Sequence, residues 1–350
     1  MTGLKVGYLP LSVELSSPGD RRRLVYWAKA RGHTLVTDLS QKVDVLVASE
    51  RTDFQSPIFD DHRTPVVFDL VDAYLSPLSV YDDLGRSIAK RASGQLSGPI
   101  KKFSEYIGNF CARSNAVVCS SVEQEILIRQ FNSNTHVILD FHEEIPLINT
   151  LPGSGDSSRI HTVMWEGLPA TIGGVRFLST TLTQLAATKN LLFEFVTDEV
   201  YYKYLGKYIK KHTSHLLKQN LSQIQTRINV VPWSPENLVT TARKSSVAMI
   251  PIDLSIPMQK LKPENRLLIM WRLGLPCLTS PSPAYSRVAE LAGVNAVCLD
   301  EKEWLKKFHN LLENPEFAHQ EVVRGQNYIM QYHSREILLR KWDRAIESVV

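Results

Sequence analysis

The sequence is poor in cysteine: its four residues of this type, Cys111, Cys119, Cys277 and Cys298, are scattered through 350 positions. No two of them form a Cys-x-x-Cys pair, and none belongs to a Cys/His cluster with metal-ligand spacing. The pattern excludes a zinc-finger type of site, and we expect no bound metal. Because three of the four lie in apolar runs, we expect buried thiols and a reducing, cytoplasmic compartment.

The sequence also lacks a long apolar run and a strong excess of charge. No run reaches the length of a membrane span, and Met1–Tyr8 is predicted to be a first strand rather than a signal peptide. A net charge of +4 is too small to indicate nucleic-acid binding. The basic, tyrosine-rich segment Tyr201–Gln219 is predicted to be a surface helix. Peripheral contact with the inner face of an anionic membrane stays open as an alternative.

No Gly-x-Gly-x-x-Gly fingerprint is present, which disfavours an NAD-type site. Short apolar runs instead alternate with helical patterns through both halves of the chain. The expected strands lie at 4–9, 34–37, 43–48, 66–68, 116–119 and 137–139, and then at 160–165, 191–196, 227–233, 247–251 and 294–298. Such alternation predicts an α/β protein with parallel strands and right-handed crossovers. Ligands of these sheets bind beyond the carboxyl ends of the strands.

Polar residues follow two strands of the first half. Gly19 and Asp20 lie in the loop after the first strand and are expected to face a cleft, with a simple helix entry as the alternative. Asp69 and Asp72 fall at the carboxyl end of strand 66–68, where carboxylates can act as a general base or bind an acceptor. The alternative is a helix cap with a surface salt bridge. We favour Asp72 in the cleft, and we expect Arg21–Arg23 to be solvated.

The segment Asp140–Ser158 is rich in proline and glycine and has little periodicity, so it is predicted to be a linker between two domains. His142, followed by Glu143 and Glu144, leaves the first sheet there. An imidazole and two carboxylates could do acid–base work. The alternative is a set of polar residues at a solvated crossover.

The most informative stretch is Lys260–Pro276. Pro263 is expected in the first turn of a helix that Gly274 and Pro276 stop. The N–H groups of that turn and the helix dipole favour an anion such as a diphosphate. Lys260, Lys262 and Arg266 would add positive charge at the same end. An ordinary amphipathic helix with solvated charges is the alternative.

That helix is followed by Gly-Leu-Pro, a strand at 277–280, a turn and a helix that begins near Tyr285. The run resembles the donor-binding half of GT-B glycosyltransferases, especially the retaining family-4 type. The resemblance implies two facing Rossmann-like, doubly wound domains with a cleft between them. Residues 1–150 would form the acceptor-side domain and 151–332 the nucleotide-sugar domain. The helix at 333–350 would pack back on the first domain.

The resemblance also implies roles for particular residues. The donor would be bound by Gly167, Val231, Trp233, Lys260, Lys262, Glu264, Asn265 and Arg266; Gly19, Asp69 and His142 would lie on the acceptor side, with Asp72 and Asp20 as catalytic candidates. The sequence departs from the family pattern in two places. Many members carry a second glutamate seven residues after the first, where this chain has Met270, Trp271 and Arg272. The basic residue usual in the loop after Gly167 is absent, and Arg176 is the nearest.

The function that the resemblance implies is transfer of a sugar from a UDP- or GDP-sugar to a carbohydrate, lipid-linked or other acceptor, without metal or cofactor. Two alternatives stay open. A nucleotide-sugar isomerase would share nearly all of these features. A non-catalytic scaffold with the same fold would explain the missing glutamate and the missing basic residue.

Overall fold

The computed structural model describes residues 3–61, 63–149, 160–203 and 209–350. The chain divides into two compact units. The first comprises residues 1–142, 261–263 and 333–350, and the second comprises residues 143–260 and 264–332. The expected domain boundary at residue 150 and the 150–158 part of the expected linker lie outside the described residues.

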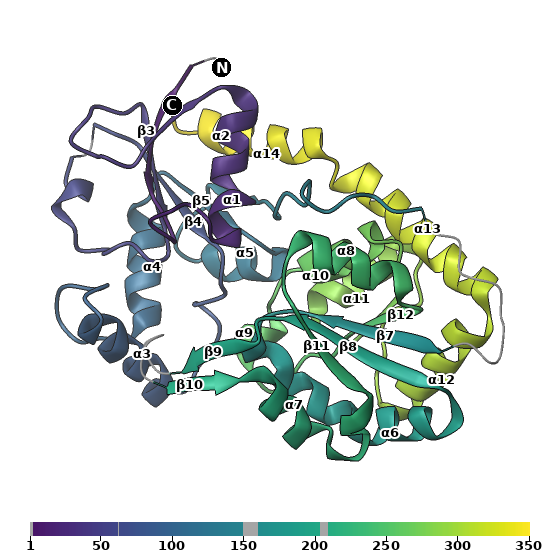
Figure 1. Cartoon of the computed structure of the whole chain (residues 1–350). Helices are drawn as coiled ribbons and strands as arrows, with labels where there is room; N and C mark the ends of the chain where they lie inside the picture. The colour runs from purple at the N-terminus through teal and green to yellow at the C-terminus, as the bar shows by residue number, and fades with distance from the viewer. Residues whose placement is uncertain (1–2, 62, 150–159, 204–208) are drawn as a thin grey trace. The chain divides into compact units, whose positions relative to one another are not determined.

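The first unit contains a parallel sheet of six strands in the order β2-β1-β3-β4-β5-β6 (Figure 1). The strands are β1 Lys5–Leu9, β2 Thr34–Val36, β3 Val45–Ser49, β4 Val66–Leu70, β5 Ala116–Cys119 and β6 Thr135–Val137. The helices are α1 Pro18–Arg21, α2 Leu24–Arg31, α3 Val80–Ala92, α4 Phe103–Arg113, α5 Val122–Ile128 and α14 Arg335–Glu347. This order reverses direction at β1, as in a doubly wound sheet.

Apolar runs explain the central strands of this sheet. Every residue of β3 and β5 is buried, as expected for parallel strands that are covered on both faces. The core on one face is aromatic: Phe110 of α4 packs edge-on against Phe68 of β4 at 4.8 Å between ring centroids and lies 4.9 Å from Phe54. Such ring pairs stabilise the packing beyond their buried area.

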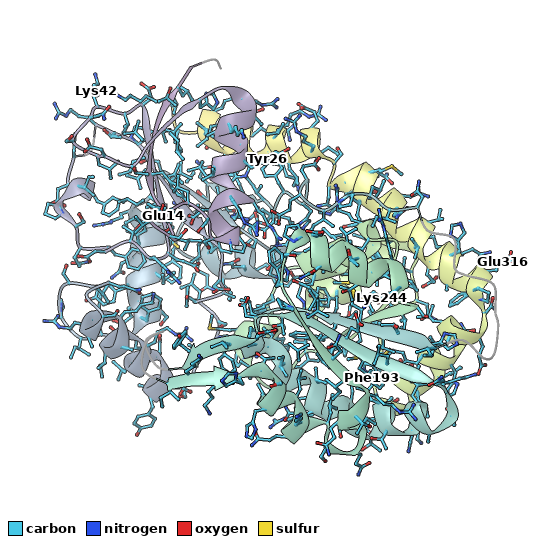
Figure 2. The ribbon with its side chains drawn as sticks, viewed as in Figure 1. Glu14, Tyr26, Lys42, Phe193, Lys244 and Glu316 are labelled. Atoms are coloured by element: carbon cyan, nitrogen blue, oxygen red, sulfur yellow. The ribbon has the colours of Figure 1, made fainter. Side chains whose placement is uncertain are left out.

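The final helix, α14, belongs to the first unit and packs on α2. Trp342 is fully buried and stacks on Trp27 at 6.1 Å between centroids. Asp343 accepts hydrogen bonds from Trp27 Nε1 at 2.8 Å and from Arg31 Nη2 at 2.6 Å. Tyr26, labelled on α2 in Figure 2, accepts a hydrogen bond from Arg335 Nε at 2.9 Å. Helices α2 and α14, which lie more than 300 positions apart in the sequence, therefore pack together in the core of the first unit.

The second unit contains a parallel sheet in the order β11-β8-β7-β12-β13. Its strands are β7 His161–Glu166, β8 Leu191–Thr197, β11 Ile228–Pro232, β12 Val247–Ile250 and β13 Cys277–Thr279. The helices are α6 Ser179–Thr188, α7 Thr213–Asn220, α8 Pro235–Lys244, α9 Pro257–Lys260, α10 Asn265–Arg272, α11 Pro283–Ala292, α12 Glu301–Glu313 and α13 Pro315–Tyr332. Figure 1 shows α6 and α7 on one face of the strands and α8, α10 and α11 on the other. Phe193, labelled in Figure 2, lies on β8 and is fully buried.

Three sequence-based expectations for this unit are wrong. Tyr201–Gln219 is not one helix: it contains strands β9 Val200–Lys203 and β10 Ile209–His212, which pair antiparallel, before α7 begins. The helical pattern after Gly174 predicts a helix from Val175 to Ala187, but residues Pro169–Leu178 form 3₁₀ turns and the α-helix begins only at Ser179. The expected strand at 294–298 is reduced to one bridge between Thr279 and Val297.

Two other expectations can be compared with the described part of the chain. All four cysteines are buried and none is in a disulfide. Burial raises the pKa of each thiol, to about 12 for Cys111, Cys119 and Cys298. These thiols therefore behave as small core side chains. Among the described helices, none combines the length and the apolar character needed to cross a bilayer.

Candidate functional site

Glu166 is the centre of a cluster at the carboxyl edge of the second unit's sheet. It is the last residue of β7 and is 8% exposed. Trp233, directly after β11, donates its Nε1–H to Glu166 Oε1 at 3.1 Å. Arg266, in the first turn of α10, donates from Nη2 to the Glu166 main-chain carbonyl, and its Nε lies 3.7 Å from Glu166 Oε2. One carboxylate thus positions an aromatic ring and a guanidinium from two other elements.

Gly167 allows this approach because it has no side chain. Its φ is +156°, a conformation that L side chains rarely adopt. A Cβ here would lie 3.1 Å from Arg266 Cζ and 3.1 Å from Thr171 Oγ1. The Arg266 guanidinium also lies 5.0 Å from the centre of the Trp165 ring, within cation–π range. Its side chain is 20% exposed, so the cation is held firmly but still reaches solvent.

Helix α10 begins at Asn265 with Glu264 as its N-cap residue, two positions later than expected, so Pro263 precedes the helix rather than lying in its first turn. The Glu264 side chain does not cap the helix; it is 2% exposed and lies 3.7 Å from Arg287. The first-turn N–H groups therefore lack a side-chain cap from the N-cap residue, which suits an anion. The predicted end of the helix is confirmed, because Gly274 follows it with a φ of +72°.

The remaining predicted donor residues differ in position and exposure. Lys260, the last residue of α9, is exposed, and Lys262 is partly exposed. Val231 is a partly exposed residue of β11. Arg176, the nearest basic residue to the loop after Gly167, lies 3.7 Å from Asp253 Oδ2. Its charge is thus already paired.

The three residues at the positions where a second glutamate could fall have structural contacts within the second unit. Met270 is fully buried. Trp271 packs so tightly that a Cβ on Gly325 would lie 2.3 Å from its ring. Arg272 donates from Nε to the Ile145 carbonyl at 2.9 Å. These side chains secure the incoming segment and helix α13, and none of the three is a carboxylate.

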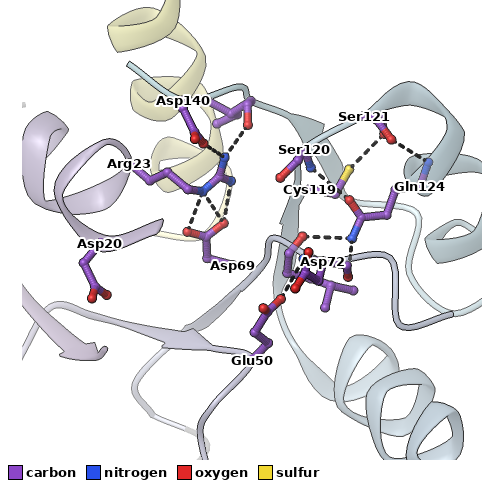
Figure 3. Close-up of polar contacts among 12 residues, drawn as sticks. Asp20, Arg23, Glu50, Asp69, Asp72, Cys119, Ser120, Ser121, Gln124 and Asp140 are labelled. Carbon is purple, nitrogen blue, oxygen red and sulfur yellow. Dashed lines mark hydrogen bonds and ion pairs between the residues drawn. The ribbon is translucent and has the colours of Figure 1, made fainter. Parts of the chain in front are cut away.

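The first unit has its own cluster of carboxylates at the carboxyl edge of its sheet (Figure 3). Asp69 accepts hydrogen bonds from Arg23 Nη2 at 2.6 Å and from Arg23 Nε at 3.0 Å. Arg23 is fully buried and also donates to the Ile138 carbonyl at 2.7 Å. The expectation that Arg23 is solvated is therefore wrong. The salt bridge of Asp69 is buried rather than on the surface.

Asp20 is also buried, and its oxygens already accept four hydrogen bonds. The donors are Tyr8 Oη at 2.7 Å, Leu11 N at 2.8 Å, Ser12 N at 2.9 Å and Ser12 Oγ at 2.6 Å. Burial, and then the charges of Asp69 and Asp20, raise the pKa of Tyr8 far above its usual value. This arrangement fixes the loop after β1. Gly19 and Asp20 themselves lie in the short helix α1, so the alternative of a helix entry describes them. Gly19 is packed there, since a Cβ would lie 2.3 Å from Leu11 Cδ1.

Asp72 differs from these two aspartates because its side chain is partly exposed. Its main chain is fixed on both sides. The Asp72 N–H donates to Glu50 Oε2 at 2.8 Å, and the Asp72 carbonyl accepts from Gln124 Nε2 at 2.9 Å. Gln124 also accepts from Ser120 N at 3.1 Å, which ties the loop after β4 to the loop after β5.

Sequence reasoning missed Glu50, the first residue after β3. It is 6% exposed. Burial, and then the nearby charge of Asp72, raise its pKa to about 8. The signal that could have found it is its position, because it follows a strand that pairs with β4 and ends at the same edge of the sheet.

His142 is buried, with 5% exposure, at the end of the first unit. Glu143 and Glu144 are exposed, and Glu143 Oε1 lies 3.6 Å from Arg272 Nη1. The three residues therefore have different surroundings and do not form one catalytic cluster. In the part of the chain that the structure describes, no three His, Cys, Asp or Glu residues are grouped so as to hold a metal ion.

Two parallel-sheet units with polar clusters at the carboxyl edges of their strands define a protein built from Rossmann-like domains. No protein-family model matches the chain, and no curated protein matches it. Solved structures do match.

The structure of HepE from Anabaena, in complex with UDP and glucose, has a TM-score of 0.63 at 13% identity and covers 99% of this chain and 100% of HepE. WaaG, a glycosyltransferase involved in lipopolysaccharide biosynthesis, has a TM-score of 0.59 at 9% identity and covers 98% of each chain. TarM has a TM-score of 0.59 at 12% identity over 86% of this chain, which spans only 54% of TarM. These neighbours share the GT-B fold. At such identities the likeness shows the fold, and this chain has the GT-B fold, as the motif resemblance predicted.

Proposed function

We propose that this protein is a metal-independent glycosyltransferase that moves a sugar from a UDP- or GDP-sugar to a carbohydrate or lipid-linked acceptor in the cytoplasm. One observation carries the proposal: Glu166 holds Arg266 and Trp233 together beside Gly167, at the start of α10. A fixed cation, an aromatic ring and close main-chain approach suit a nucleoside diphosphate. The GT-B fold of the structural neighbours supports it, since one of them was solved with UDP and glucose.

In this proposal, the segment Lys260–Arg266 neutralises the diphosphate as it leaves. Arg266 and the first-turn N–H groups of α10 are oriented before the donor binds, so little reorganisation is needed when negative charge develops. Lys260 and Lys262 add positive charge from the preceding turn. Trp233 and Val231 would lie along the nucleotide base, with the indole fixed by its bond to Glu166.

The acceptor side is assigned to the first unit. Asp72 is the partly exposed carboxylate of its cluster, whereas Asp20 and Asp69 have their oxygens engaged by neighbouring groups. In an inverting reaction, Asp72 would take the proton of the acceptor hydroxyl. In a retaining reaction no such base is required, and Asp72 would bind the acceptor instead. Gly19 and His142 would then support the acceptor side through packing and would not contact the acceptor.

Two alternatives use the same site. A nucleotide-sugar isomerase would bind the same donor but release no transferred product. A non-catalytic scaffold is favoured by one observation, that Arg272 binds the Ile145 carbonyl where a second glutamate could fall. A scaffold would leave a nucleotide-sugar unchanged.

Peripheral contact with an anionic membrane is a separate part of the proposal. On α3, Tyr81 and Ile88 are 88% and 50% exposed and lie two helical turns apart, on one side of the helix. Ile100, 58% exposed, follows in the next loop beside Lys101 and Lys102. Exposed apolar side chains next to lysines suit a membrane surface. Flotation with neutral and with anionic vesicles tests this membrane contact. If the protein floats with neither kind of vesicle, the membrane contact is refuted.

Thermal stabilisation by UDP, GDP, ADP, TDP and CMP, each with and without EDTA, tests the central proposal. A ligand that binds only the folded protein stabilises it by about 2.7 kcal/mol at 100 times its Kd. We expect one nucleoside diphosphate to raise the Tm equally with and without EDTA. Incubation with the matching nucleotide-sugar, followed by product analysis, then separates a transferase from an isomerase and a scaffold. No shift with any nucleotide would refute the donor site.

A further inference from the structure

The cluster around Glu50 lies outside the donor site and has its own chemistry. Glu50 follows β3 and Asp72 follows β4, and these strands are direct neighbours in the sheet. The Asp72 N–H donates to Glu50 Oε2 at 2.8 Å, so the two residues are joined through a hydrogen bond as well as through their charges. Glu50 is buried beneath a loop whose Asp72 side chain reaches solvent.

We propose that Glu50 and Asp72 form an acceptor subsite, in which the Asp72 carboxylate accepts a hydrogen bond from a hydroxyl of a neutral sugar and Glu50 positions Asp72 from below. This inference rests on the proposed transferase function and adds a positioning residue and an acceptor class to it. Gln124 completes the support by holding the Asp72 carbonyl at 2.9 Å and the Leu70 carbonyl at 3.0 Å. A main chain held on both sides presents the carboxylate in one direction.

The surrounding charges select a hydroxyl over an amine. A carboxylate only accepts hydrogen bonds, so its ligand must be a donor, either a hydroxyl or an ammonium group. Arg86 Cζ and Lys90 Nζ lie 5.0 Å and 5.7 Å from the centre of the Tyr74 ring. Burial lowers the pKa of Lys90, whereas the nearby charges of Glu50 and Asp72 act to raise it, so this cation is close to both carboxylates. These two cations make an ammonium ligand unfavourable, whereas a neutral hydroxyl is not repelled.

The proton on Glu50 makes the subsite sensitive to pH. Burial, and then the charge of Asp72, raise the pKa of Glu50 from 4.5 to about 8. The hydrogen bond from the Asp72 N–H acts against this rise, and by smaller amounts Asp69 raises and Lys90 lowers the pKa. At neutral pH Glu50 therefore holds its proton. Above pH 8, Glu50 becomes a second anion next to Asp72. Two adjacent carboxylates repel each other and disturb the loop that presents Asp72.

Three variants test the assignment: Asp72→Asn, Glu50→Gln and, as a control with the same chemical change on an exposed side chain of this unit, Glu105→Gln. The probes are methyl α-D-glucopyranoside, methyl α-D-mannopyranoside and glucosamine, with release of nucleoside diphosphate from the donor as the readout. We expect Asp72→Asn to raise the KM for the neutral glycosides at least tenfold with unchanged nucleotide affinity. We expect Glu50→Gln to have the wild-type KM for the neutral glycosides at pH 7. At pH 9 we expect the KM of the wild type to rise and that of Glu50→Gln to stay unchanged.

The subsite would be refuted if Asp72→Asn left the KM for the neutral glycosides unchanged, or if the KM of Glu50→Gln and of the wild type rose equally at pH 9. It would also be refuted if glucosamine were used better than the neutral glycosides, or if neither glycoside increased the release of nucleoside diphosphate. A measurement without substrates separates this failure from failure of the transferase proposal. The folded state retains the Glu50 proton between pH 4.5 and 8 while the unfolded state loses it, so wild-type stability falls across that range. Urea unfolding must show a shallower decline for Glu50→Gln than for wild type and Glu105→Gln. Parallel curves would refute the pairing of Glu50 with Asp72, whether or not the protein binds nucleotides.

Discussion

Arg266 gives the sharpest test of the donor site. Its guanidinium donates to the Glu166 carbonyl, lies 3.7 Å from the Glu166 carboxylate and stacks over Trp165 at 5.0 Å. Replacing Arg266 with alanine removes a charged donor that is already oriented toward the site. Hydrogen bonds to charged groups contribute about 1.5–3 kcal/mol. We therefore expect the Kd of the preferred nucleoside diphosphate to rise roughly 10- to 150-fold.

Isothermal titration calorimetry of the variant measures this change, with Arg243→Ala as the control because Arg243 is an exposed arginine of the same unit. The substitution also affects stability, since Glu166 is 8% exposed and loses the cation beside it. Leaving a buried group without its partner costs about 1–3 kcal/mol. The titration is therefore run well below the Tm of both variants. A folded Arg266→Ala protein with wild-type affinity would refute the assignment of Arg266 to the diphosphate.

Three further predictions concern stability. Arg23→Met leaves Asp69 charged and unpaired in the core, so urea unfolding should show a loss of about 3–5 kcal/mol; a loss below 1 kcal/mol would contradict the buried ion pair. Gly167→Ala forces a strained main chain, for which we expect a loss of about 1–3 kcal/mol and weaker nucleotide binding, while unchanged stability would show that the strain is absent. Burial acts to raise the pKa of Asp343, but hydrogen bonds from Arg31 outweigh it and hold the pKa below its usual value. The ionised Asp343 therefore stabilises the folded protein at neutral pH, and this stabilisation is lost as the pH falls through the folded-state pKa. We expect Asp343→Asn to reduce the fall in the free energy of unfolding at acid pH, measured by urea unfolding; the same fall in the variant and the wild type would contradict this.

The general fold could be predicted because its signals are local. Apolar runs such as Val66–Leu70 and Ala116–Cys119, separated by helical patterns, indicate parallel strands without knowledge of their partners. Ser121 followed three residues later by Gln124 is a capping-box pattern that predicts the start of helix α5, and Ser121 Oγ accepts a hydrogen bond from Gln124 N at 3.1 Å. The prediction of a helix at Tyr201–Gln219 was wrong because tyrosine and lysine indicate neither a helix nor a strand clearly. The pairing of β9 with β10 is a contact across the chain that the local pattern does not show.

The site was harder to predict because its partners are distant in sequence. Arg23 lies 46 residues before Asp69, and the sequence alone gives no reason to bury an arginine within an Arg-Arg-Arg run. Glu166 was overlooked in favour of Gly167 for the same reason: its partner Arg266 is 100 residues away. Glu50 differs, since its position after a strand could have identified it before any contact was known.

The position of α14 has a consequence for biosynthesis. Trp342 and Asp343 pack against Trp27, so the first unit is completed by residues that are translated after the whole second unit. Until residues 333–350 have left the ribosome, Trp27 lacks its cover and its hydrogen-bond acceptor. A nascent chain paused before this helix would expose an aromatic surface to chaperones, however completely its second unit had folded. The first unit, although it begins the chain, is therefore expected to be the last to reach its final stability.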